Sequence, residues 1–152
     1  RYRTTMLEPI ELPAIARANR EATQGRAMEL IELDQQFAGH HPEWLLLTPA
    51  STRVGKDYLT RLRPLQDERT VQRLFDAVRF GRTPGHHLTV FGLTMAVFSI
   101  AKRQGLADYA QHALEAIVTT AASKLKFTQS ERDALLTRSQ VRLPEAIDRM
   151  VA

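Results

Sequence analysis

Two pairs of adjacent histidines are the residues best suited to metal chemistry in this sequence. They occur in similar settings, one between Gly39 and Pro42 and the other directly after Pro84-Gly85. Neutral imidazole binds zinc, copper and iron, so the two pairs could bind one metal if their segments met at one end of a helical bundle. Neither pair has the i, i+4 spacing of helical metal ligands. We therefore expect both pairs to lie in polar loops near helix ends, and the metal-ligand candidates remain His40, His41, His86 and His87.

The other reactive residue types do not form a catalytic motif. The chain has no cysteine, which excludes thiolate catalysis and cysteine-ligated zinc. No serine lies in a Gly-x-Ser-x-Gly turn. The Gly55-Lys56 pair lacks the first glycine and the Ser or Thr of a phosphate-binding loop. We expect no catalytic residue and no cofactor, and the sequence favours a non-enzymatic protein.

Basic side chains gather in the middle of the chain. Residues 53–82 hold eight basic and four acidic side chains, within a chain of formal net charge +4. The candidates for contact with a nucleic-acid backbone are Arg61, Arg63, Arg69 and Arg73. Arg69 and Arg73 lie one helical turn apart and could both touch phosphates. The interleaved acidic residues are typical of a solubilising surface instead. The excess of arginine over lysine also fits a GC-rich bacterial genome.

The elements that must position these residues are predicted to be helices. The chain has 152 residues, of which 43% are hydrophobic and 25% charged, so it can form one compact core. Apolar residues recur at the three- and four-residue spacing of amphipathic helices. We predict an all-α fold, a single-domain bundle of about seven or eight helices around a central hydrophobic hairpin (88–104, 106–126). Residues 1–11 are expected to be an irregular N-terminal lead-in and 12–152 a single helical domain.

The first helix of the predicted hairpin is apolar on every side. Such a helix is buried all round or embedded in lipid. The apolar run from Leu88 to Ala101 falls short of the roughly 20 residues that cross a bilayer, so we expect a buried helix and no membrane span. Together with the apolar stripe over 106–125, it could offer more apolar surface than one small domain covers. The surplus would form a homodimer face.

These features favour a protein that works by contacting other proteins. A helical bundle without a cluster of reactive side chains indicates an adaptor, a regulator or a subunit of an intracellular assembly. The expected partner is a protein, with a second copy of the chain as one candidate, and a cytoplasmic location is the default. The expected partner contacts are Trp44, Tyr58 and Arg63, taken to be exposed around a groove. The alternative is a nucleic-acid-binding regulator that uses the basic segment 53–82.

Overall fold

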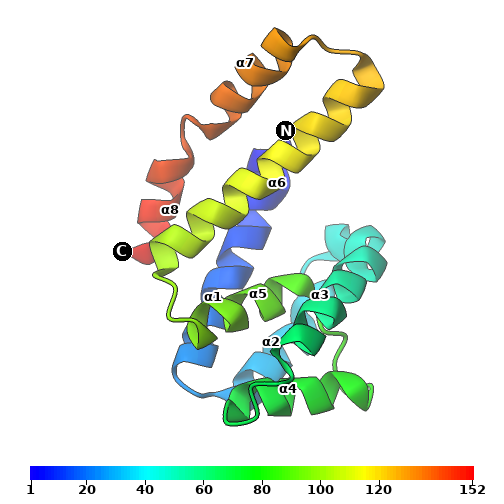
Figure 1. Cartoon of the computed structure of the whole chain (residues 1–152), viewed down its shortest axis with the longest axis vertical. Coiled ribbons are helices and arrows are strands. Elements are labelled where there is room, and N and C mark those ends of the chain that lie inside the picture. Colours follow the sequence, from blue (N-terminus) through cyan, green and yellow to red (C-terminus); the bar gives the residue numbers. More distant parts are fainter. The chain divides into compact units, whose positions relative to one another are not determined.

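The computed structural model describes all 152 residues. It is 82% helical and has no strands, which confirms the predicted all-α fold. In chain order the helices are η1 (Arg3–Glu11), α1 (Leu12–Thr23), α2 (Ala27–His40), η2 (Pro42–Leu47), α3 (Thr48–Leu62), α4 (Arg69–Arg79), α5 (His87–Val97), α6 (Lys102–Leu125), α7 (Gln129–Gln140) and α8 (Leu143–Val151) (Figure 1). η1 is a π-helix and η2 is a 3-10 helix.

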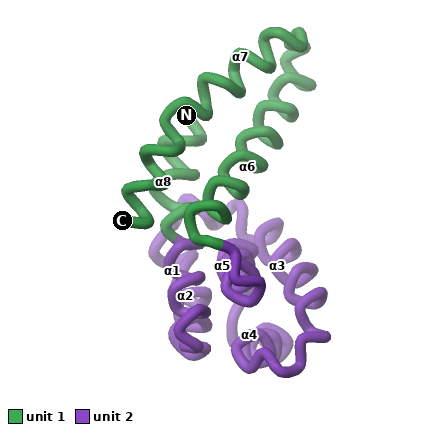
Figure 2. The backbone as a smooth tube through the Cα atoms, turned by 60° about the vertical axis from the view of Figure 1, so that its left-hand side comes forward, with its two compact units in different colours: residues 1–13, 101–152 green, residues 14–100 purple.

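The chain divides into two compact units, coloured separately in Figure 2. Unit 1 contains Arg1–Pro13 and Ala101–Ala152, and unit 2 contains Ala14–Ile100. Residues 3–11, expected to be irregular, form η1 in unit 1. Leu7 and Ile10 are buried on one side of this helix, and their packing outweighs the helix-breaking tendency of the local prolines.

Unit 2 is built on the packing of α3 against α5 and of α2 against α4. Its hydrophobic core is contributed by several helices and consists of Ala18, Leu30, Ile31, Leu59, Leu62, Val71, Leu74, Ala77, Val90 and Leu93. α4 is strongly amphipathic. Its buried face carries Val71, Leu74 and Ala77, and its exposed face carries Arg73 and Arg79. The spacing of its apolar residues therefore determines which face of α4 enters the core.

α5 is buried on most of its sides, as the sequence predicts, but it is shorter than the predicted helix 88–104. It ends at Val97, and Ser99 adopts a left-handed backbone conformation with φ of 53°. The helix break therefore lies at 98–101 and not at Gly105, which is buried inside α6. The two helices predicted to form one hairpin belong to different units, where α5 packs on α3 and α6 packs on α7 and α8. The apolar run continues to Ile100, so hydrophobicity alone does not mark the break.

Gly92 allows α5 to lie very close to α1 within unit 2. A Cβ at position 92 would be 2.7 Å from both the Cβ of Ala18 and the backbone nitrogen of Asn19. The Asn19 side-chain amide donates to the carbonyl of Gly92 at 3.4 Å. The small residues at this crossing let the two backbones approach, which is why a glycine is accommodated inside a helix.

Unit 1 is organised by α6, whose buried residues recur every fourth position along one face. They are Leu106, Ala110, Leu114, Val118 and Ala122. α7 begins with a capping box in which the side chains and backbones of Thr128 and Glu131 bond reciprocally, as expected from the sequence. The Tyr109 hydroxyl donates to the carboxylate of Glu11 at 2.5 Å and ties η1 to α6. None of the helices in either unit is both long and apolar enough to cross a membrane.

Candidate functional site

Asp34 is a fully buried carboxylate at the centre of a polar cluster in unit 2. Its Oδ2 atom accepts hydrogen bonds from the Thr83 hydroxyl and the Gly85 backbone N–H, both at 2.6 Å. Its Oδ1 atom accepts the backbone N–H of His86 at 2.8 Å. His86 precedes the first residue of α5, so the negative charge lies where a helix leaves backbone N–H groups unpaired. One side chain of α2 thereby anchors the start of α5.

The Ser51 hydroxyl connects α3 to the same two histidines. Its Oγ atom lies 2.8 Å from Nδ1 of His87 and 3.2 Å from Nδ1 of His86, and it accepts the His87 backbone N–H at 3.3 Å. A hydroxyl has one proton, so Ser51 donates to one imidazole and accepts from the other. The tautomers of the two histidines are therefore linked. We call Asp34, Ser51, Thr83, His86 and His87 the Asp34 cluster.

The Phe37 ring brings the two histidine-containing segments into contact. Its centroid lies 4.9 Å from that of His41 and 5.2 Å from that of His86. Trp44 packs edge-on against Phe37 at 5.3 Å and stacks on His87 at 5.9 Å. The segments thus converge through aromatic packing. No three His, Cys, Asp or Glu side chains are arranged to hold a metal ion, and His40 is exposed at the end of α2.

Gly55 lets α3 approach the residues that precede α5. A Cβ at position 55 would overlap the carbonyl oxygen of Gly85 and lie 2.9 Å from the His87 nitrogen. Gly85 itself has a φ of 78°, a left-handed conformation that glycine adopts without a steric penalty. Two glycines therefore permit the close contact that brings Ser51 within reach of both imidazoles.

Burial disfavours the charged form of both histidines of the Asp34 cluster. Loss of solvent lowers the pKa of His86, and the neighbouring Asp34 carboxylate opposes this in part. Loss of solvent also lowers the pKa of His87 to about 4, with a further contribution from His86. The Nε2 atom of His86 and the Nε1 atom of Trp44 are buried and have no hydrogen-bond partner. Both His pairs are close to helix ends as expected, one at the end of α2 and the other at the start of α5, but His86 is fully buried and not in a polar loop.

The Asp34 cluster contains the residue types of a hydrolase triad in a different arrangement. In a triad the carboxylate holds the imidazole, and the serine hydroxyl is open to substrate. Here the Asp34 carboxylate accepts backbone N–H groups, and the side chain of Ser51 is buried. The cluster therefore joins α2, α3 and α5, and its chemistry is that of a structural hydrogen-bond network.

No short motif marks Asp34, although the sequence holds a signal for it. It lies three residues before Phe37 and three after Ile31, which places it on the apolar face of α2. A charged residue on a buried face requires hydrogen-bond partners. An acidic residue on the apolar face of a helix is therefore the sequence signal for this cluster.

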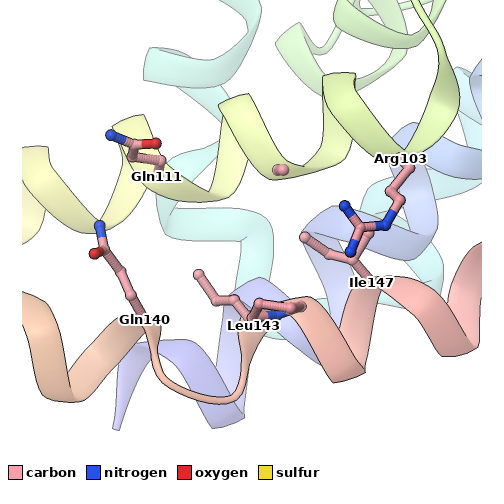
Figure 3. Close-up of a pocket in the computed structure, with 7 residues that line it drawn as sticks. Arg103, Gln111, Gln140, Leu143 and Ile147 are labelled. Atoms are coloured by element: carbon pink, nitrogen blue, oxygen red, sulfur yellow. The ribbon is translucent and has the colours of Figure 1, made fainter.

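A pocket lies within unit 1, between α6 and α8. This pocket of about 230 Å³ is lined by Arg103, Ala107, Gln111, Gln140, Leu143, Pro144 and Ile147. Figure 3 shows Leu143 and Ile147 of α8 on the side opposite Gln111 of α6, with Gln140 at the end of α7. Arg103 is bound to Asp148 at 2.7 Å, so its charge is already compensated. The pocket is thus lined by apolar side chains, two neutral amides and an arginine that is already ion-paired.

The comparisons with known proteins place this chain in a family. Residues 4–140 match the family model described as UreF. The chain belongs to the UreF family. Proteins of this family are urease accessory proteins that work within a protein assembly. No curated protein and no solved structure matches the chain.

The expected partner contacts of this UreF-family chain differ in their exposure. Trp44 is buried, with 2% of its surface exposed, so its prediction as an exposed contact is wrong. It fills the space between Phe37 and His87 because its large ring gains more from burial than from solvent contact. Tyr58 and Arg63 are exposed on or directly after α3, as expected.

The arginines proposed for nucleic-acid contact are all exposed but lie in two groups, one at the end of α3 and the other on α4. Arg61 lies 5.6 Å from the Tyr58 ring and Arg63 lies 5.2 Å from the Phe75 ring. Arg69 and Arg73 lie on α4. The first two guanidinium groups therefore pack on aromatic rings, while the second two point away from the buried face of α4.

Proposed function

We propose that this UreF-family chain is a non-enzymatic adaptor or regulator that contacts other urease proteins within an assembly. The family match over residues 4–140 carries this proposal. The structure supports it through the Asp34 cluster, whose serine and histidines bond to one another and to the backbone. These groups hold helices together and are not presented to a substrate.

Exposed apolar side chains on η2 form a candidate surface for contact with a partner protein. Leu45, Leu46 and Leu47 of η2 are 59%, 93% and 42% exposed. Consecutive aliphatic residues with this exposure are unfavourable in water unless a partner covers them. Tyr58 and Arg63 complete the proposed set of contacts in unit 2, with Leu46 replacing the buried Trp44.

A second copy of the chain is one partner that we propose for this apolar surface. The apolar surface expected from residues 88–101 is smaller than predicted, because most of α5 is buried in unit 2, and what remains is mainly Phe98 and Ile100, which are 59% and 38% exposed. The exposed leucines of η2 are the better candidates. Light scattering of the purified chain should then give the mass of a dimer, and Leu46→Glu should give the mass of a monomer. A monomer for the unmodified chain would remove self-association and leave the other urease proteins as partners.

The adaptor role is tested by co-expression of the chain with the urease subunits and the other accessory proteins of its own organism. We expect the chain to co-purify with at least one of these proteins through size-exclusion chromatography. Leu46→Glu should weaken this association, whereas a change at exposed Gln24, Gln24→Glu, should not. A chain that elutes alone from every such mixture would contradict the proposed function. The cytoplasmic location stays a prediction.

Nucleic-acid binding by the segment 53–82 stays an alternative, supported by eight exposed basic side chains that form no ion pair with a carboxylate. Contacts with phosphates must weaken steeply as salt rises. A gel-shift assay over a salt series measures this directly. Absence of binding at low salt would remove the alternative.

A further inference from the structure

We infer that a pocket between α3 and α4 binds an acidic segment of a partner protein that inserts an apolar side chain. The α3–α4 pocket is lined by Lys56, Leu59, Phe75, Val78 and Arg79 and has a volume of about 300 Å³. The inference rests on the proposed function, because it names the chemistry of the partner that the adaptor would contact. All five residues that line the pocket lie within unit 2.

The floor of the α3–α4 pocket is apolar. Leu59 is 1% exposed and belongs to the core of unit 2, and Phe75 and Val78 are half-buried against that core. This floor is continuous with the hydrophobic core and is held in place by it. A leucine-sized side chain from a partner would be stabilised there, because it would leave water and cover this apolar floor.

The edge of the α3–α4 pocket is positively charged. Lys56 from α3 and Arg79 from α4 are both exposed and line the same opening. The guanidinium of Arg63 lies 5.2 Å from the centroid of the Phe75 ring, so a third cation is adjacent to the floor. The lining includes no carboxylate. The opening therefore favours an anionic group beside an apolar one.

These cations are not neutralised within the chain. Ion pairs form at Arg3, Arg20, Arg26 and Arg103, and none involves a basic residue of 53–82. Arg79 instead packs over the ring of Phe80, which is 68% exposed, at 5.5 Å. Guanidinium groups held over rings keep their N–H donors available for carboxylates. Charge complementarity thus indicates an acidic occupant.

An acidic protein segment fits this surface better than a nucleic acid does. Phosphates would satisfy the cations but would leave the apolar floor uncovered. Asp57 and Asp76 lie beside Lys56 and Phe75 in the sequence and would repel a continuous phosphate backbone. A protein segment can place its carboxylates next to the three cations and avoid these positions.

The test uses the full chain and a fluorescent peptide with one central leucine between short runs of glutamate. Fluorescence anisotropy should show binding that weakens with salt, because the contacts are partly electrostatic. Replacing the glutamates by glutamine, or the leucine by serine, should weaken binding by about tenfold or more. Equal binding of the glutamine peptide, or tighter binding of a DNA duplex than of the acidic peptide, would overturn the inference.

Matched variants locate the site. Lys56→Glu with Arg79→Glu should reduce peptide affinity by about tenfold or more. The control is Arg69→Glu, which makes the same change of charge at one position of α4 outside the pocket. This variant should change the peptide affinity by less than about threefold. All three positions are exposed and form no ion pair, so circular dichroism should report an unchanged fold. Lys56→Ala with Arg79→Ala provides the same test without charge reversal. Equal losses in the pocket and Arg69 variants would contradict a specific pocket.

The outcome separates this inference from the proposed function. If the doubly substituted chain still co-purifies with urease proteins and the peptide does not bind, the pocket is wrong and the adaptor role stands. If the peptide binds at the pocket but the unmodified chain associates with no urease protein, the adaptor role is wrong.

Discussion

The backbone N–H of His86 donates to the buried carboxylate of Asp34 at 2.8 Å, across fifty-two positions of the chain. This bond attaches the start of α5 to α2, and two further bonds to the same carboxylate hold Thr83 and Gly85. The apolar helix α5 is thereby placed against α3 with its first turn fixed. The position of a hydrophobic helix in unit 2 depends on one charged residue.

Replacing this carboxylate by an amide should destabilise the chain strongly. In Asp34→Asn the negative charge is lost, and one carboxylate oxygen is replaced by an NH₂ group. This group cannot accept the buried backbone N–H groups that now bond to Asp34. We expect the free energy of unfolding to fall by roughly 3 kcal/mol, measured by urea denaturation. The matched control is Glu29→Gln on the exposed face of α2, which should change it by less than about 0.5 kcal/mol. Similar values for both variants would show that the Asp34 cluster does not stabilise the fold.

The close approach of α3 to the segment before α5 gives a second prediction. Gly55→Ala should destabilise the chain by about 1–3 kcal/mol, because the added methyl group overlaps the Gly85 carbonyl. The control Gly39→Ala adds a methyl group with no heavy atom within 4 Å and lies inside α2, so it should be neutral or stabilising. Thermal unfolding of both variants measures the difference. A Gly55→Ala chain as stable as the control would show that the two segments are farther apart.

Stability should also fall in mildly acidic solution. Burial lowers the pKa of His87 to about 4 in the folded chain, whereas the unfolded imidazole takes up a proton near its ordinary value of 6.5. The free energy of unfolding is therefore highest above pH 6.5, where the imidazole is neutral in both states. It falls as the pH drops toward 4, because the unfolded chain takes up the proton first. The loss amounts to at most about 3 kcal/mol.

Urea denaturation over a pH series measures this effect. His87→Gln should make the dependence between pH 6.5 and 4 clearly shallower, because glutamine does not titrate there, while the contribution of His86, whose pKa burial also lowers, stays. His112→Gln, at an exposed histidine of α6, should keep the dependence of the unmodified chain. Identical slopes for these two variants would show that His87 is not the residue responsible.

The sequence predicts the helices of this fold better than it predicts their packing. Hydrophobic spacing indicates α4, and the Thr128-Glu131 pair marks the start of α7, because both signals are local. The break after α5 depends on the left-handed conformation of Ser99, which carries no sequence signature as glycine would. The assignment of α5 and α6 to different units depends on contacts between distant residues, which periodicity does not contain.

The candidate site is predicted only in part for the same reason. The histidine pairs draw attention from the sequence, but whether they bind a metal or pack on an aromatic ring depends on where Phe37 lies. Trp44 is buried through contacts with a residue over forty positions away. The membership of the chain in the UreF family follows from the match over residues 4–140 and not from any short motif.

The adaptor role is tested most directly by urease activity in a host that carries the chain's own urease genes. Deleting the gene for this chain should leave the amount of urease protein unchanged and reduce its activity, because an accessory protein acts on the assembly and not on the substrate. Supplying the unmodified chain should restore activity. Full urease activity without the chain would contradict the role proposed for it.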